Sequence, residues 1–175
     1  MIKDWFHKSP LEEGFSLIQA QILAMIPGAT WNPCHPGQAP GSFWCHLIID
    51  KELKLKIEEL INYRVYPDFY IWNYKNIKKL KVHRDTNDRG HSREVSGILP
   101  LIGDFKTEVY HEDDLTSPID NCVYGPGEVL FLNNTRYYHG GDVLSETRLS
   151  LHFYLDFFNE GNKTLEQLLN LNRIS

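Results

Sequence analysis

The stretch DFYIWNYKNIKKLKVHRD, residues 68–85, decides how the chain is built. Before it, apolar residues recur at helical spacing, and from Asp68 onward the sequence changes to short aromatic and β-branched runs broken by polar or glycine-rich turns. Such runs are typical of a sandwich or barrel of short strands. We expect a mainly β fold with flanking α-helices, a cupin-like jelly roll that encloses an interior between two sheets. The predicted strands lie near 69–74, 78–84, 94–101, 106–111, 121–124, 128–132, 136–139 and 147–156.

Helices are expected on both sides of the strand region. Ser9-Pro10-Leu11-Glu12 combines a hydroxyl N-cap, a proline at the first helical position and a glutamate three residues after the cap. This pattern predicts a helix that starts there and ends at Pro27-Gly28. A second helix is predicted after Asp50, ending before Pro67, and a third from Thr164.

The length of 175 residues fits one compact domain. We expect N-terminal helices and a proline-rich loop over 1–66, a double-stranded β-helix core over 67–158 and a C-terminal helix over 159–175. Within the first part, the prolines and glycines of 29–42 predict a long loop. The hydrophobic share of 42% and charged share of 23% are those of a globular protein and exclude a disordered chain.

The net charge, the hydropathy and the cysteine content limit which partners and which cellular compartment we expect. A formal net charge of -5 provides no basic footprint, so no extended nucleic-acid surface is expected. No apolar run approaches the roughly 18 residues that a membrane span needs, and the first ten residues lack an export pattern. Cys34, Cys45 and Cys122 are an odd number at scattered spacings, as in reduced thiols. We therefore expect a cytoplasmic protein without a membrane partner, and the oligomeric state stays open.

Three side chains form a candidate metal site. His83 and Asp85 are two positions apart at the end of a predicted strand, so they project from the same face. His139 follows much later in the chain, and a rolled sheet brings such distant strand ends together. Two histidines and one carboxylate leave about three of six octahedral positions open, which suits non-heme iron(II) oxygen chemistry.

A second candidate site follows His139. Arg148 and Ser150 are also two positions apart in a predicted strand and share a face. A guanidinium can grip a carboxylate with two hydrogen bonds, and a hydroxyl two residues on can donate another. The pair is a candidate carboxylate anchor.

The order His83-x-Asp85, then His139, then Arg148-x-Ser150 resembles the iron(II)/2-oxoglutarate-dependent oxygenase superfamily, which folds as a double-stranded β-helix. The resemblance covers about residues 70–156. Ile71-Trp72-Asn73-Tyr74 and Gly125-Pro126-Gly127-Glu128-Val129-Leu130-Phe131 also resemble it. The layout is similar to the prolyl-hydroxylase-like branch, although arginine stands where that branch usually has a distal lysine.

The resemblance implies a dioxygenase that uses Fe(II), 2-oxoglutarate as cosubstrate and O2. Such an enzyme hydroxylates a C–H bond of a small molecule or a peptidyl side chain and releases succinate and CO2. By the same resemblance His83, Asp85 and His139 are the catalytic metal ligands. Arg148 and Ser150 bind the cosubstrate tail, and Tyr74 hydrogen-bonds the cosubstrate.

Several alternatives stay open. His83 and Asp85 also suit a charged surface turn, and His91 is a rival third ligand for a local zinc site. Cys34-His35 and Cys45-His46 hold zinc-type side chains but lack a Cys-x-x-Cys spacing. The whole set also fits a non-catalytic cupin-like module that binds a metal or carboxylate. The substrate is not named, because the loops 29–42, 86–93 and 112–120 would shape its pocket.

Overall fold

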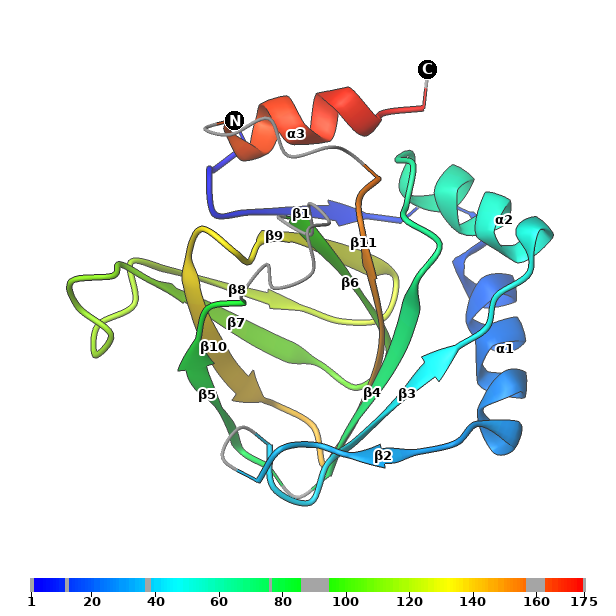
Figure 1. The fold of residues 1–175 in the computed structure, drawn as a ribbon, viewed down its shortest axis with the longest axis horizontal. Coiled ribbons are helices and arrows are strands. Elements are labelled where there is room, and N and C mark those ends of the chain that lie inside the picture. Colours follow the sequence, from blue (N-terminus) through cyan, green and yellow to red (C-terminus); the bar gives the residue numbers. More distant parts are fainter. Residues whose placement is uncertain are drawn as a thin grey trace.

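The computed structural model describes residues 2–11, 13–36, 39–75, 77–85, 95–156 and 163–174. Two antiparallel sheets form the centre of this part of the chain (Figure 1). The larger sheet has seven strands in the order β1-β9-β6-β11-β4-β3-β2. Its strands are β1 (Phe6–Pro10), β9 (Glu128–Asn133), β6 (Val95–Ile102), β11 (Thr147–Tyr154), β4 (Phe69–Lys75), β3 (Phe43–Leu47) and β2 (Asn32–Pro33).

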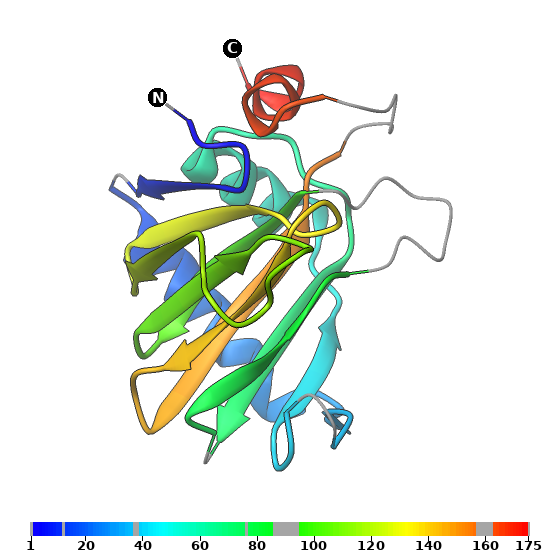
Figure 2. The same ribbon diagram turned by 90° about the vertical axis from the view of Figure 1, so that its left-hand side faces the viewer.

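The smaller sheet has four strands in the order β5-β10-β7-β8. They are β5 (Lys79–His83), β10 (Tyr138–Val143), β7 (Phe105–Tyr110) and β8 (Asp120–Tyr124). Figure 1 shows the two sheets as opposed layers, with β5, β7 and β10 on one side and β4, β6 and β11 on the other, and Figure 2 views them from the side of the smaller sheet. The predicted mainly β, jelly-roll architecture is confirmed.

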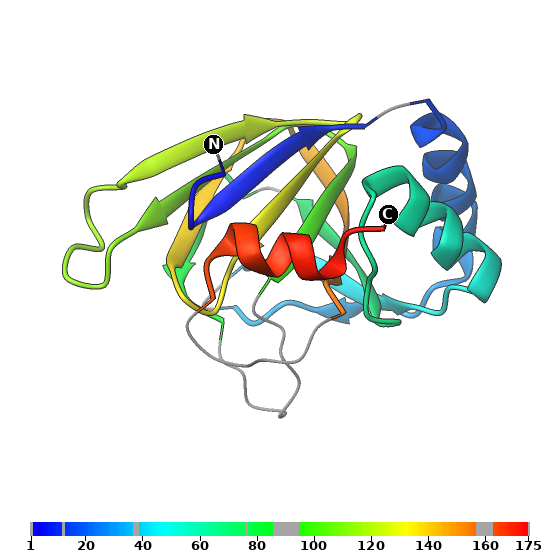
Figure 3. The ribbon, with the colours of Figure 1, turned by 90° about the horizontal axis from the view of Figure 1, so that it is seen from above.

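Three helices flank the larger sheet. α1 (Phe15–Met25) continues into a 3-10 turn (Ile26–Gly28) and lies beside α2 (Lys51–Ile61), while α3 (Leu165–Asn172) crosses near the N-terminus (Figures 1 and 3). Buried residues of all three helices join strand residues of the larger sheet in one hydrophobic cluster. This packing leaves the other face of the sheet free to line an interior. No helix in the described ranges is both long and apolar enough to cross a membrane.

The predicted start of the first helix is wrong. Phe6–Pro10 is an edge strand, β1, in antiparallel register with β9, and Pro10 ends it opposite Glu128. The helix begins at Phe15 after Gly14, whose φ of 110° lies in the left-handed region. Pairing with a buried strand outweighed the local capping pattern, and a terminal proline on an edge strand removes no bond that the sheet needs.

The other helix signals hold. The Asp50 carboxylate accepts a hydrogen bond from the Leu53 backbone N–H at 2.8 Å and caps α2. Thr164 and Gln167 form a reciprocal capping box at the start of α3. Both signals lie within four residues of sequence, so they act before any tertiary contact forms.

The eight predicted strands are present within one to four residues of their expected ends. The largest shift is at 136–139, where β10 runs instead from Tyr138 to Val143 through two glycines. Strands β2 and β3 were not predicted. β3 lies against β4 and places Cys45 and Leu47 in the cluster beneath the helices.

Candidate metal centre

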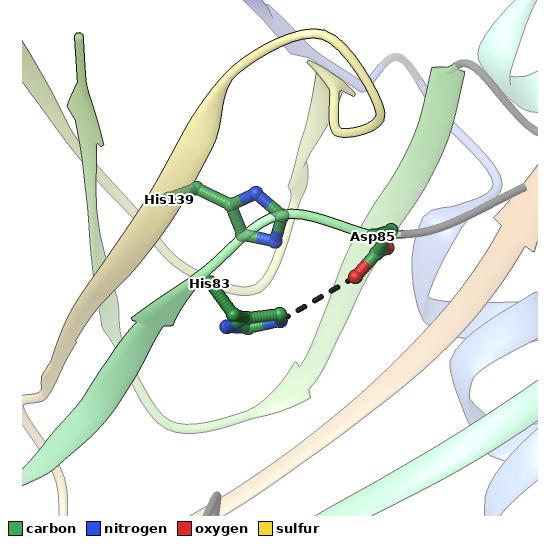
Figure 4. A group of neighbouring side chains, drawn as sticks. All are labelled: His83, Asp85 and His139. Carbon is green, nitrogen blue, oxygen red and sulfur yellow. Dashed lines mark ion pairs between the residues drawn. The ribbon is translucent and has the colours of Figure 1, made fainter. Parts of the chain in front are cut away.

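Two neighbouring strands of the smaller sheet hold the three predicted ligands. β5 and β10 are antiparallel, and His83 at the end of β5 is the register partner of His139 in β10. Asp85 follows two residues after His83. One potential ligand atom from each of these side chains lies within 4.8 Å of the other two (Figure 4). Across the described ranges, this is the single group of three such residues that could hold a metal ion.

Backbone carbonyls orient both imidazoles in the same way. Nδ1 of His83 lies 2.8 Å from the Lys81 carbonyl oxygen, and Nδ1 of His139 lies 3.2 Å from that of Tyr137. A carbonyl only accepts, so each Nδ1 carries a proton, and in the neutral form of each ring Nε2 is the nitrogen with the free lone pair. This is the tautomer that a metal-binding histidine needs, with its other nitrogen held by the backbone.

The three groups carry different charges near neutral pH. Burial disfavours the His83 cation, but the hydrogen bonds with Asp85 and the Lys81 carbonyl outweigh it and raise the His83 pKa. Burial and the neighbouring His83 lower the His139 pKa to about 4. Burial opposes ionisation of Asp85, yet both histidines and Asn134 lower its pKa to about 2. When His83 is protonated, the metal-free site holds an ion pair, His83 Nε2 to Asp85 Oδ1 at 3.4 Å, beside a neutral His139 imidazole.

A buried arginine faces the same interior from the opposite sheet. Arg148 in β11 is 3% exposed, contacts the ring of Phe105, and has its guanidinium carbon 4.8 Å from the centre of the Tyr74 ring. Its Nε is buried and has no hydrogen-bond partner among the described residues. Burial lowers the Arg148 pKa to about 10, and the guanidinium stays charged at neutral pH. A buried cation with an unused donor is suited to an anionic ligand.

One cavity of about 380 Å³ joins the triad to this arginine. Its size is within the range of small-molecule sites. Polar, apolar and aromatic side chains all contribute to its lining. The lining includes Trp72, Tyr74, Leu80, Lys81, His83, Arg84, Asp85, Ile98, Thr107, Leu132, Asn134, His139, Arg148, His152 and Tyr154.

Of the two other predicted cosubstrate-binding residues, Tyr74 lines the cavity and Ser150 does not. Tyr74 lines the cavity beside Arg148, and burial raises its pKa, so it stays a neutral phenol that can donate. Ser150 is fully buried and does not line the cavity. Its Oγ lies 2.9 Å from Nε2 of His152, which does line it. The roles of Ser150 and Tyr74 toward a cosubstrate stay predictions.

Sequence reasoning missed several polar residues of the cavity, among them Asn134 and Thr107. Asn134 follows β9 and contacts Asp85, and Thr107 in β7 shares a 2.9 Å hydrogen bond with Tyr124. The one available signal for Asn134 was an asparagine pair, Asn133-Asn134, directly after an apolar strand.

The rival zinc sites fare differently. His91 lies outside the described residues. Cys34 and Cys45 are buried in different hydrophobic clusters, so they belong to separate parts of the core. His46 pairs instead with Asp68, Nε2 to Oδ1 at 2.9 Å.

The donor atoms fit the predicted ligands. Two imidazole nitrogens and one carboxylate oxygen on one face are the set that suits iron(II) with open positions. The unpaired Arg148 Nε, together with the neutral Tyr74 phenol, fits a carboxylate at the far end of the cavity. The arrangement can hold a metal and a dicarboxylate side by side.

Comparisons with known proteins agree at the level of structure. No family model matches the chain, and no curated protein matches it in sequence. Among solved structures, OsALKBH1 is similar with a TM-score of 0.66 at 12% identity, over 88% of this chain and 99% of that one. A prolyl hydroxylase from Trichoplax adhaerens, in complex with a hypoxia inducible factor peptide, has a TM-score of 0.62 at 14% identity, over 97% and 87%.

A third similar solved structure is described by its family. It is an oxidoreductase of the 2OG-Fe(II) oxygenase family from Burkholderia pseudomallei, with a TM-score of 0.52 at 14% identity, over 78% of this chain and 76% of that one. The chain has the fold of the 2OG-Fe(II) oxygenase family.

Proposed function

We propose that this chain is an iron(II)- and 2-oxoglutarate-dependent dioxygenase that hydroxylates a C–H bond. The observation that carries the proposal is the pairing, in one cavity, of the His83, Asp85 and His139 cluster with the buried Arg148. Either the three-residue cluster or the buried arginine, taken alone, could serve the stability of the fold. Together they provide one place for a metal and one for the tail of a dicarboxylate.

Each side chain has a defined task in this proposal. His83 and His139 offer Nε2 and Asp85 offers a carboxylate oxygen to the metal. Arg148 binds the distal carboxylate of 2-oxoglutarate, and Ser150 and Tyr74 add hydrogen bonds to the cosubstrate. When bound, iron(II), 2-oxoglutarate and O2 supply the oxidising chemistry, in which 2-oxoglutarate becomes succinate and CO2.

In this proposal the protein itself orients the metal ligands and limits the access of water to Arg148. Backbone carbonyls fix both imidazoles, and the buried strands around Arg148 keep water from competing for its guanidinium. The cavity volume suits a cosubstrate plus the reacting part of a small molecule or of a peptidyl side chain. The peptide in the Trichoplax adhaerens complex supports the peptidyl class. The three free cysteines suit a reducing compartment, and we place the protein in the cytoplasm.

Iron-dependent release of succinate tests the proposal. Purified protein is incubated with Fe(II), ascorbate, O2 and 2-oxoglutarate, and succinate is quantified with and without a panel of small molecules and peptides. We expect slow succinate formation without substrate and faster formation with a suitable one. His139→Ala should abolish both, because the metal then loses one of three protein ligands.

His111→Ala is the matched control. His111 is an exposed histidine paired with Asp113 outside the cavity, so its loss should leave succinate formation unchanged. Folded, iron-loaded wild-type protein that forms no succinate with any member of the panel would favour a non-catalytic binding module instead.

A further inference from the structure

Asn134 contacts the carboxylate of the candidate metal site from the turn between β9 and β10. Its Nδ2 donates to Asp85 Oδ2 at 2.5 Å, and its backbone carbonyl accepts from the Asp85 N–H at 3.1 Å. The side chain is 1% exposed and lines the cavity. Asp85 is therefore held at two points, side chain and backbone, by one residue of the β9–β10 turn.

The chemistry of the pair fixes which way the amide points. A carboxylate oxygen accepts hydrogen bonds, and the Asn134 Nδ2 lies against Asp85 Oδ2 as the donor. If the amide were flipped, its oxygen would face the carboxylate oxygen and no bond could form. The observed direction costs something, because the Asn134 Oδ1 is buried without a partner. Folding therefore keeps an unsatisfied oxygen in order to place an N–H against Asp85.

This contact gives the two oxygens of the Asp85 carboxylate different partners. Oδ2 is bound by Asn134, while Oδ1 faces Nε2 of His83 at 3.4 Å, the nitrogen that is free to bind a metal. We propose that Asn134 is a positioning residue that holds Asp85 Oδ2 so that Oδ1 alone is presented to the metal. This inference rests on the proposed metal centre and adds to it a residue that contacts a candidate metal ligand.

The neighbouring residue supplies a matched control. Asn133 is also 1% exposed, but its Nδ2 donates to the Asp4 carbonyl oxygen at 3.1 Å, on the side of the N-terminal segment. Both asparagines are buried and both hold this turn. Only Asn134 contacts a candidate metal ligand through its side chain, so the two substitutions separate positioning from folding.

The experiment compares Asn134→Leu with Asn133→Leu. Leucine has a similar volume and no donor, so each change removes one hydrogen bond from the turn. Anaerobic isothermal titration with iron(II) gives the dissociation constant, and the unfolding midpoint without metal reports the structural cost. The titrations are done well below both midpoints, so that only folded protein is measured.

We expect Asn134→Leu to weaken iron(II) binding by about 10- to 100-fold, the usual effect of losing a partner of a metal ligand. Asn133→Leu should lower the unfolding midpoint and leave the iron(II) dissociation constant unchanged. If either leucine variant fails to fold, Asn134→Ala and Asn133→Ala replace the pair with the same expectations.

Three results would overturn the inference. Folded Asn134→Leu that binds iron(II) as tightly as wild type would show that the contact has no positioning role. Equal weakening by both substitutions would assign the effect to the turn as a whole. Wild-type protein that binds no iron(II) would remove the metal centre itself, and with it both this inference and the proposed function.

Discussion

Arg148 is the residue whose surroundings are hardest to explain by stability alone. It is a buried cation whose Nε has no partner, packed against the rings of Tyr74 and Phe105. Its lowered pKa reports how far burial disfavours the charge. A buried charge without a counter-ion usually costs stability, and such costs are concentrated at functional sites.

Arg148→Met should therefore separate stability from binding. Methionine keeps much of the apolar volume and removes the charge, so the metal-free unfolding midpoint should stay the same or rise. Affinity for 2-oxoglutarate should fall by roughly 10- to 100-fold, because a charge-assisted hydrogen bond contributes about 1.5–3 kcal/mol.

Thermal shift with Mn(II) and increasing 2-oxoglutarate measures both quantities. Arg136→Met is the control, since Arg136 pairs with Asp4 and does not line the cavity. An Arg148→Met protein that is strongly destabilised but binds 2-oxoglutarate normally would assign the arginine a structural role.

The histidine pair predicts how metal binding depends on pH. Without metal His83 has a raised pKa and His139 has one lowered to about 4. Between about pH 5 and the raised pKa of His83, the folded protein therefore holds one imidazolium, at His83, and metal binding must displace its proton. Since a metal ligand must be deprotonated, binding should release about one proton, and the dissociation constant should rise about tenfold per unit fall in pH.

Calorimetric titration with Mn(II) in two buffers of different ionisation enthalpy counts these protons. Release of two protons at about pH 5.5, which lies inside that window, would mean that His139 is also charged in the folded protein. Release of none would mean that His83 is not a ligand.

At the scale of elements, the sequence predicted the helices that local caps define, and it did not predict the strands that depend on distant pairing partners. α2 and α3 were predicted because their caps, at Asp50 and Thr164, lie beside the residues that they cap. β1 and β3 were missed because their pairing partners, β9 and β4, lie far along the chain. In β1, that pairing outweighed a sequence with the features of a helix start.

A glycine in β6 supports a test of how the larger sheet packs. A Cβ built on Gly97 would lie 2.1 Å from the ring of Phe153, which is fully buried and packs against Phe69 and Phe131. The ring has no free space to move into. Gly97→Ala should therefore destabilise the fold by about 1–3 kcal/mol, as overpacked cores do.

Urea unfolding checks this value. Gly28→Ala is the control, because a Cβ at Gly28 meets nothing within 4 Å. Equal stability of Gly97→Ala and wild type would mean that Phe153 has more room than this packing allows.

At the scale of the whole molecule, the two sheets combine residues that are far apart in sequence. His83 and His139 come from the smaller sheet and Arg148 from the larger one, and all three line one cavity. Their spacing in predicted strands was enough to expect this meeting. Asn134 could not be predicted in the same way, because its contact with Asp85 depends on how the β9–β10 turn lies across the end of β5. The direction of the Ser150 hydroxyl toward His152 is likewise set by side-chain packing.

Anaerobic addition of iron(II) and then 2-oxoglutarate to the purified protein tests the central claim most directly. A cosubstrate chelated to iron(II) gives a weak visible charge-transfer band, which neither component gives alone. We predict that wild type develops this band and that Arg148→Met develops it only at much higher 2-oxoglutarate concentration. Folded, iron-loaded wild-type protein that shows no band at any 2-oxoglutarate concentration would contradict the claim that the triad and Arg148 form one oxygenase site.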